Sequence, residues 1–192
     1  NFAIKTRGTM TDLVADRPEL SDIKAVFDRV TLGKSTNASS LRSVLAARGN
    51  YTLFAPTNDA MAAYLKARGL QSVDQLPEED AFALAYNCIL DCGDNAAYEL
   101  SDFPSTEGEV FEVANLNDRD ISCKEDENGV FVLNGIAKVI EAKSNVEAAN
   151  GYLHQIDHVI ELSNQSILGL MLEAPNMQVM GNLLNAAGLE KV

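Results

Sequence analysis

The sequence has no tryptophan, few cysteines, few basic residues and no apolar run long enough to cross a bilayer. Its three cysteines, Cys88, Cys92 and Cys123, are odd in number, which argues against a disulfide scaffold. Only 15 Lys and Arg oppose 28 Asp and Glu over 192 residues, so the net charge is −13. This balance excludes the basic footprint of a nucleic-acid-binding protein and disfavours contact with an anionic membrane. Neutral or basic partners fit the charge better.

The chain also shows no signal peptide, and Asn1 is not a natural start residue. We therefore expect a processed or truncated chain whose targeting segment lay upstream. Hydrophobic residues make up 46% of the sequence, which is ordinary for a globular protein with one well-buried core.

Two patterns resemble metal sites, and the spacing of each argues against one. His154 and His158 lie in a predicted strand, where residues four apart are separated by about 13 Å, too far for one ion. The stretch Lys124–Gly135 resembles a calcium loop, but its first and twelfth positions, Lys124 and Gly135, supply no ligand side chain. We expect no metal site. His154 should bond to the backbone at the core edge, with His158 exposed.

No set of residues indicates catalysis. The Thr57–Asp59 turn offers a hydroxyl, but no Ser/His/Asp or Cys/His set stands at a recognisable spacing. The acidic group Glu78–Asp80 begins a predicted helix, where the helix dipole accounts for it. A glycine-rich phosphate loop is absent. The sequence therefore predicts a protein without catalytic residues or a cofactor, and not an enzyme.

The first half of the chain is predicted to form helices around one strand. Apolar residues recur at helical spacing in Met10–Val14, Leu20–Val30 and Leu41–Leu45. Tyr51–Ala55 has strand character, Pro56 ends it, and Thr57 or Asn58 can cap a helix that continues through Ala60–Ala67. A further helix is predicted over Glu78–Leu90. The stretch Tyr51–Met61 thus predicts a strand followed at once by a capped helix.

From Tyr98 onward the apolar pattern favours strands joined by turns. Strands are predicted at the following ranges: Val110–Val113, Ile121–Cys123, Val130–Leu133, Ile136–Ala142 and Tyr152–Leu162. Three Asn-Gly pairs, at Asn128, Asn134 and Asn150, precede strands, and Asn-Gly is a strong hairpin signal. Helices first and hairpin-linked strands afterwards predict an α+β fold rather than a parallel βαβ fold.

The end of the chain repeats its beginning. Thr9–Leu20 aligns without a gap with Ser166–Met177, so that Pro18 falls on Pro175 and Val26 on Leu183. The sequence then stops where the strand of the first copy would follow, and a helical pair cannot bury its apolar face alone. We expect a complete domain at 1–163 and the helical opening of a second, incomplete one at 164–192.

Two stretches resemble the signatures of the fasciclin, or FAS1, domain family. The first is "TLFAPTNDAM" at Thr52–Met61, and the second is "NGIAKVIEAKSNVEAANGYLHQIDHVI" at Asn134–Ile160. The resemblance covers Thr9 to Leu162 and implies the FAS1 fold, a wedge-shaped β-sandwich with a layer of short helices. It also implies tandem copies and an extracellular or surface setting, often on envelope lipoproteins in bacteria.

The resemblance implies two contact regions. The family's Tyr-His pair looks like Tyr86 and Asn87, so the aromatic is kept and the His is lost. The family's Asp-Ile pair looks like Asn145 and Val146, followed here by Glu147. Because the acidic residue of that pair is missing, integrin binding of the animal type is not expected.

The leading hypothesis is an adhesion or binding module outside the cytoplasm, at the cell surface, in the periplasm or secreted. It would be anchored by an upstream segment and make weak contacts with surface or matrix proteins or glycans, beside a tandem FAS1 neighbour. The candidate partner-binding residues are Tyr86, Asn87, Asn145, Val146 and Glu147. One alternative is a small-ligand carrier or envelope enzyme with a pocket between helices and sandwich, and another is a passive spacer.

Overall fold

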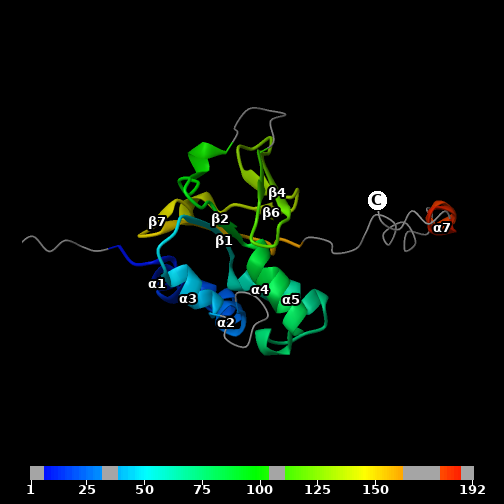
Figure 1. Ribbon diagram of the computed structural model, residues 1–192, viewed down its shortest axis with the longest axis horizontal. Helices are drawn as coiled ribbons and strands as arrows, with labels where there is room; N and C mark the ends of the chain where they lie inside the picture. Colours follow the sequence, from blue (N-terminus) through cyan, green and yellow to red (C-terminus); the bar gives the residue numbers. More distant parts are fainter. Residues whose placement is uncertain (1–6, 32–38, 104–110, 162–177, 187–192) are drawn as a thin grey trace, which may run out of the picture. The chain divides into compact units, whose positions relative to one another are not determined.

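A computed structural model describes residues 7–31, 39–103, 111–161 and 178–186. The chain divides into a larger unit, Asn1–Ile160, and a smaller one, Glu161–Val192. In the larger unit a layer of helices lies against one face of a four-stranded sheet, and a second four-stranded sheet lies on the other side (Figure 1). This open, sandwich-like arrangement with a helical layer confirms the predicted α+β fold.

The first sheet holds the two FAS1-like signatures side by side. Its strand order is β2-β1-β8-β7, with the bounds Ile89–Asp91, Tyr51–Pro56, Gly151–Ile156 and Val146–Ala148. The central pair, β1 and β8, is parallel, and the outer pairings are antiparallel. All six residues of β1 are buried, because both faces of this strand are covered.

The second sheet is a row of antiparallel strands in the order β3-β4-β5-β6. Their bounds are Phe111–Ala114, Asp120–Glu125, Phe131–Leu133 and Ala137–Lys138. Asn128–Gly129 turns the chain between β4 and β5, and Asn134–Gly135 turns it between β5 and β6. Both residues of the latter pair have positive φ, 49° and 72°, as a type I′ hairpin turn requires. The predicted hairpins are confirmed.

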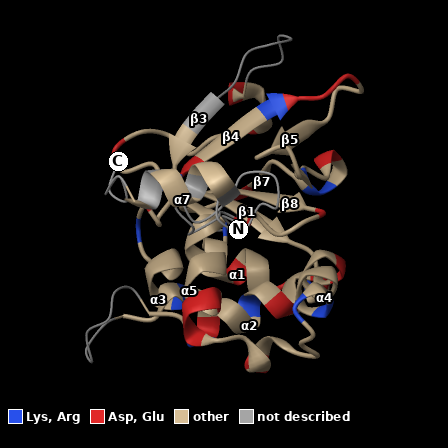
Figure 2. Ribbon diagram, turned by 90° about the vertical axis from the view of Figure 1, so that its right-hand side faces the viewer, with Lys and Arg blue, Asp and Glu red and all other residues tan. Residues whose placement is uncertain are grey.

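Among the described residues, the helical layer consists of five short α-helices. They are α1 (Met10–Ala15), α2 (Ser21–Arg29), α3 (Leu41–Ala46), α4 (Asn58–Ala67) and α5 (Glu78–Asn87). The described part of the larger unit also contains four 3₁₀ turns: η1 (Pro18–Leu20), η2 (Val73–Gln75), η3 (Leu100–Asp102) and η4 (Glu141–Lys143). The acidic residues of the first turn of α5 stand at the positive end of its dipole (Figure 2).

The turn after β1 holds the helical layer to the sheet. Thr57 caps α4, since its hydroxyl accepts from the Ala60 N–H at 3.3 Å. The Asn58 side chain accepts from the Asp22 N–H at 3.1 Å and donates to the Pro18 carbonyl at 3.0 Å. This turn therefore ends a strand, begins a helix and fixes the start of α2, which gives it a sufficient structural role.

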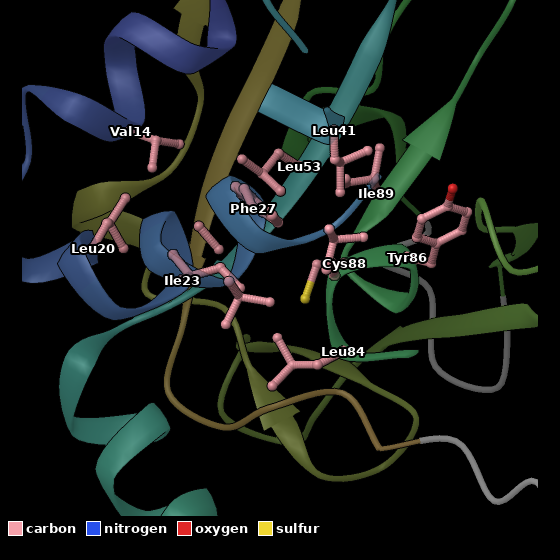
Figure 3. Packing of buried hydrophobic residues seen from close by; sticks show 14 of the residues in the cluster. Val14, Leu20, Ile23, Phe27, Leu41, Leu53, Leu84, Tyr86, Cys88 and Ile89 are labelled. Carbon is pink, nitrogen blue, oxygen red and sulfur yellow. The ribbon is translucent and has the colours of Figure 1, made fainter. Parts of the chain in front are cut away.

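The core against the helices is mainly aliphatic. Leu53 and Leu153, on β1 and β8, are fully buried and belong to one cluster with Ile23, Val26 and Phe27 of α2. Figure 3 shows Leu53, Ile23 and Phe27 close together within this cluster. Apolar side chains at i, i+3 and i+4 give α2 the face that the sheet requires.

Three element boundaries differ from the sequence prediction. The helix predicted over Glu78–Leu90 ends at Asn87, and Ile89–Asp91 forms β2, because these residues pair with β1. Cys88 and Cys92 therefore flank β2. The strand predicted over Ile136–Ala142 shortens to β6, followed by η4, and β8 ends at Ile156 rather than Leu162.

The smaller unit is described only at α7, Gln178–Ala186. In the gapless alignment of Thr9 with Ser166, the bounds of α2 fall on those of α7. Met180 and Leu183, the counterparts of buried Ile23 and Val26, are 52% and 61% exposed. Most of the predicted partial repeat at 164–192 lies outside the described residues, and a second FAS1 domain there stays a prediction.

Candidate binding surface

Tyr86 belongs to the core of the helical layer. It is 6% exposed, and its ring stacks on Phe82 at 3.9 Å between centroids. Its hydroxyl donates to the Thr31 carbonyl at 3.2 Å. Figure 3 shows Tyr86 beside Cys88 and Ile89 in the buried cluster. A partner could not reach most of this side chain without unfolding the layer.

Asn87 is also interior, with 3% exposure. Its amide donates to the Ile160 carbonyl at 3.4 Å and accepts from the Asn117 side chain at 3.2 Å and the Asn115 side chain at 3.5 Å. The residue thus joins the end of α5 to the β3–β4 turn. Burial argues against Tyr86 and Asn87 as contact residues, because both side chains are used inside the fold.

Asn145–Glu147, the other predicted region, reaches the surface at the start of β7. Asn145 and Glu147 are exposed and Val146 is half-buried. Asn145 adopts a left-handed conformation, with φ 54°, and its side-chain oxygen accepts from the Leu100 N–H at 2.8 Å. The Asn145 N–H donates to Nδ1 of His154 at 3.3 Å. The backbone here is held at two points.

His154 anchors that loop from inside the protein. Since its Nδ1 accepts from Asn145, the proton lies on Nε2, which donates to the Tyr98 carbonyl at 2.9 Å. The ring also lies against Phe54 and Phe103, with centroids 5.6 and 6.3 Å away. Burial lowers the pKa of His154, so the imidazole is held neutral. The predicted backbone bond is confirmed, although the residue lies in the core rather than at its edge.

Three further polar residues surround the loop on the adjoining strand and segments. Tyr152 stands opposite Glu147 in the β7–β8 register, and its hydroxyl donates to Glu99 at 2.5 Å. Glu147 in turn pairs with Arg7. The hydrogen bond to Glu99 is the main cause that raises the pKa of Tyr152 to about 12. We name Arg7, Glu99, Asn145, Glu147 and Tyr152 the β7–β8 patch.

The sequence reasoning missed Tyr152, Glu99 and Arg7. One signal was present for Tyr152: a two-residue turn at Ala149–Asn150 would set Ala148 against Gly151 and therefore Glu147 against Tyr152. Glu99 and Arg7 come from distant parts of the chain, and nothing local in the sequence places them there.

The two predicted contact regions do not meet. Asn87 precedes β2 and Asn145 precedes β7, and these are the two edge strands of the first sheet. Three strand spacings, about 14 Å, separate the edges. The two regions cannot form one compact contact.

The residues with catalytic or ligating potential are engaged in the fold. His158 is exposed and bonds to Asp157 at 2.8 Å, while the Asp126 carboxylate accepts from the Asn128 and Val130 N–H groups of its own turn. Burial raises the pKa of the Cys88 and Cys123 thiols to about 12, which keeps them protonated and unreactive. Among the described residues, no three His, Cys, Asp or Glu are grouped to hold a metal.

The structure shows a groove of about 340 Å³ within the helical layer. It lies between α2, α4 and the segment that follows α4, rather than between the helices and the sandwich. The small-ligand alternative placed its pocket between helices and sandwich, so this groove does not support it in that form.

Comparisons with known proteins show which family the chain belongs to. No curated protein is significantly similar to the chain. Among solved structures, the chain is similar to the FAS1 domain pair of the insect cell adhesion molecule fasciclin I, at 18% identity and a TM-score of 0.42. That match covers 73% of this chain and 47% of the other, so the chain spans about half the length of that pair. The Fasciclin domain family model matches residues 29–162. The chain belongs to the fasciclin domain family.

Proposed function

We propose that this protein is a non-enzymatic binding module that makes weak adhesive contacts with surface or matrix proteins or glycans. Membership of the fasciclin family over residues 29–162 supports an adhesion or binding role in general, because such domains occur in cell adhesion proteins. The specific contact surface in this proposal is the β7–β8 patch.

The observation that carries the proposal is the fixed geometry of polar groups on that patch. The Asn145 backbone is tied to His154 and its side chain to Leu100, so the loop is ordered before any partner arrives. Glu147 and Tyr152 are similarly held by Arg7 and Glu99. Groups that are already ordered lose little entropy on binding, which favours recognition through a small surface.

The proposed location is outside the cytoplasm, at a cell surface, in a periplasm or in secreted form. Fasciclin domains occur in extracellular and surface proteins, which supports this location. Within the described ranges, no helix is long and apolar enough to cross a membrane. An anchor supplied by another segment and a tandem FAS1 neighbour both belong to the proposal.

The non-enzymatic part of the proposal is supported by the way nucleophiles and bases are used. Both ring nitrogens of His154 bond to the backbone, so this imidazole has no nitrogen free to activate a nucleophile. The Thr57 hydroxyl, the most suggestive group in the sequence, caps α4.

The test is a binding screen of the purified chain against immobilised matrix proteins and surface glycans, read by biolayer interferometry. Glu147→Ala removes an exposed carboxylate from the patch, and Glu127→Ala, at the exposed β4–β5 turn, is the matched control. We expect saturable binding that Glu147→Ala weakens by about fivefold, while the control stays at the wild-type value.

Saturable binding that Glu147→Ala leaves intact would keep the adhesion module and reject the patch. No binding across the panel would reject adhesion and favour a passive spacer. Because single contacts of this kind are weak, a tandem pair should retain its partner much longer than one copy through effective concentration.

A further inference from the structure

The groove in the helical layer is open to solvent and lies between packed elements. Its walls come from α2, from α4 and from the chain between α4 and η2. Its lining includes Asp22, Ala25, Ala62, Leu70, Val73 and Asp74. At about 340 Å³ it lies near the lower end of the roughly 300–1,000 Å³ range of ligand sites.

One wall of the groove is formed where the chain folds back after α4. Gly69 has φ 71° and donates to the Lys66 carbonyl at 3.0 Å, while the Leu70 N–H reaches the Leu65 carbonyl at 2.9 Å. These two bonds form a Schellman motif, which ends a helix and redirects the chain.

Side chains then hold the redirected segment in place. Arg29 of α2 donates to the carbonyls of Val73 and Leu76, the latter at 3.0 Å. The Gln75 side chain accepts from the Gln71 N–H at 2.6 Å. The wall is therefore anchored to α2, and the groove is preformed rather than a gap between loose segments.

The lining is apolar along the helices. Leu65 and Val73 are buried, and Ala25 and Ala62 are small enough to leave space between α2 and α4. Ala62 is exposed, so the space opens to solvent. An aliphatic side chain entering here would replace water over apolar surface, which is favourable in proportion to the area covered.

The charged part of the lining has one sign. Asp22 and Asp74 both line the groove, and no cation among the residues that the structure describes pairs with either carboxylate. Two cations of α2 are already engaged: Lys24 pairs with Asp28 at 2.8 Å, and Arg29 bonds to the two carbonyls. The groove therefore presents a small apolar surface beside two carboxylates that pair with no described cation, of which Asp22 lies at the positive end of the α2 dipole.

We propose that this groove docks a segment of a partner protein in which an aliphatic side chain is flanked by Lys or Arg. The aliphatic group lies over Ala25, Ala62 and Leu70, which keep part of their surface exposed, and the cations meet Asp22 and Asp74. The inference rests on the proposed binding function and gives it a second surface, of different chemistry from the β7–β8 patch. The net charge of −13 attracts such a basic partner from a distance.

The test uses three fluorescent peptides that differ only at their centre, Lys-Leu-Lys, Lys-Ser-Lys or Glu-Leu-Glu, within Gly-Ser flanks. Fluorescence anisotropy measures their affinity for the wild-type chain. We expect saturable binding of the Lys-Leu-Lys peptide, with each of the other two at least about tenfold weaker. Equal binding of the lysine peptides would reject the apolar contact. No binding of any peptide would reject the groove as a docking site.

Two variants place the contact. Asp22→Asn with Asp74→Asn keeps the shape of both side chains and should lower the affinity for the Lys-Leu-Lys peptide about tenfold. The matched control, Asp120→Asn with Glu127→Gln, removes two exposed charges elsewhere and should keep wild-type affinity apart from a small, salt-dependent change. Ala62→Leu fills the groove from an exposed helical position and should abolish binding. Peptide affinity unchanged in the Asp pair or in Ala62→Leu would overturn the proposal.

The same variants separate this inference from the proposed function. Binding to a matrix or surface partner that is lost in Glu147→Ala but kept in the groove variants leaves adhesion standing and rejects a role for the groove in it. Groove-dependent peptide binding with no partner in the panel supports the groove and rejects the adhesion proposal.

Discussion

The two faces of the central strands β1 and β8 are built from different chemistry. Toward the helices the strands present Leu53 and Leu153, which pack in an aliphatic cluster. Toward the second sheet they present Phe54 and His154, which pack with Phe103. One face is held by apolar packing, and the other adds hydrogen bonds from a buried imidazole.

This difference determines which side of the sheet can respond to pH. Apolar burial depends little on pH, whereas a buried imidazole whose nitrogen accepts a hydrogen bond must lose that bond when it is protonated. His154 holds the Asn145 loop and the Tyr98 segment, so the sheet-facing side and the β7–β8 patch share one sensitive group. The helical layer holds no imidazole among its described contacts; its titratable link to β8 is the Glu19 carboxylate, which accepts from the Gln155 side chain at 3.1 Å, and this bond lowers the pKa of Glu19.

The largest expected effect comes from Gly151, which serves both faces because it begins the parallel pairing of β8 with β1. Its φ is 145°, and an added Cβ would lie 1.8 Å from the Tyr51 carbonyl oxygen. We expect Gly151→Ala to lower the free energy of unfolding by about 3 kcal/mol or more, measured by urea denaturation.

Gly135→Ala is the matched control. Gly135 also has positive φ, 72°, but an added Cβ meets nothing within 4 Å. Gly135→Ala should lower the free energy of unfolding by only about 1–2 kcal/mol, which is the strain of an alanine in the left-handed region. Equal losses in the two variants would show that backbone conformation, and not the close approach of β1, makes Gly151 necessary.

A smaller effect should appear at His154 and depend on pH. Burial lowers the pKa of His154 below the ordinary 6.5, so below that pH the unfolded chain binds more protons than the folded chain. The contribution of neutral His154 to the free energy of unfolding is therefore fully present above about pH 6.5. It is lost as the pH falls through the lowered pKa. His154→Gln should lower the free energy of unfolding by about 1–3 kcal/mol at pH 7.5. Its free energy of unfolding should also decline less steeply than that of the wild type from pH 6.5 to 5.

His158→Gln controls for the loss of an imidazole, because His158 is exposed and bonds to its neighbour Asp157. It should retain the wild-type decline. A wild-type slope that persists in His154→Gln would mean that another group titrates, and the contrast between the two faces would then not extend to pH.

Much of this arrangement could be predicted from local sequence, and the rest could not because it is tertiary. Helical spacing predicted α1 to α3, the cap after Pro56 predicted α4, and the Asn-Gly pairs predicted the hairpins. The parallel pairing of Tyr51 with Gly151 has no local signal, since the partners are far apart in the chain. Cys88–Leu90 continued a helical pattern, but pairing with β1 outweighed it.

The candidate site residues, too, could be predicted only in part. Resemblance placed Asn145–Glu147 at the surface, where the structure has it. It also suggested Tyr86 as a contact, whereas the structure buries this residue on the apolar face of α5. Packing within the fold determines which helical side chains remain accessible, and a resemblance of residue pairs carries no information about that packing.

Tyr86 provides the smallest test, and it concerns the helix-facing side alone. Tyr86→Phe keeps the stacked ring and removes the hydroxyl that donates to Thr31, so we expect a loss of about 0.5–1.5 kcal/mol. This loss should be independent of pH between 5 and 7.5, and Tyr86→Phe should leave binding in the partner screen unchanged. If Tyr86→Phe abolished binding while the protein stayed folded, the hydroxyl would be a contact after all, and the β7–β8 patch would not be the whole surface.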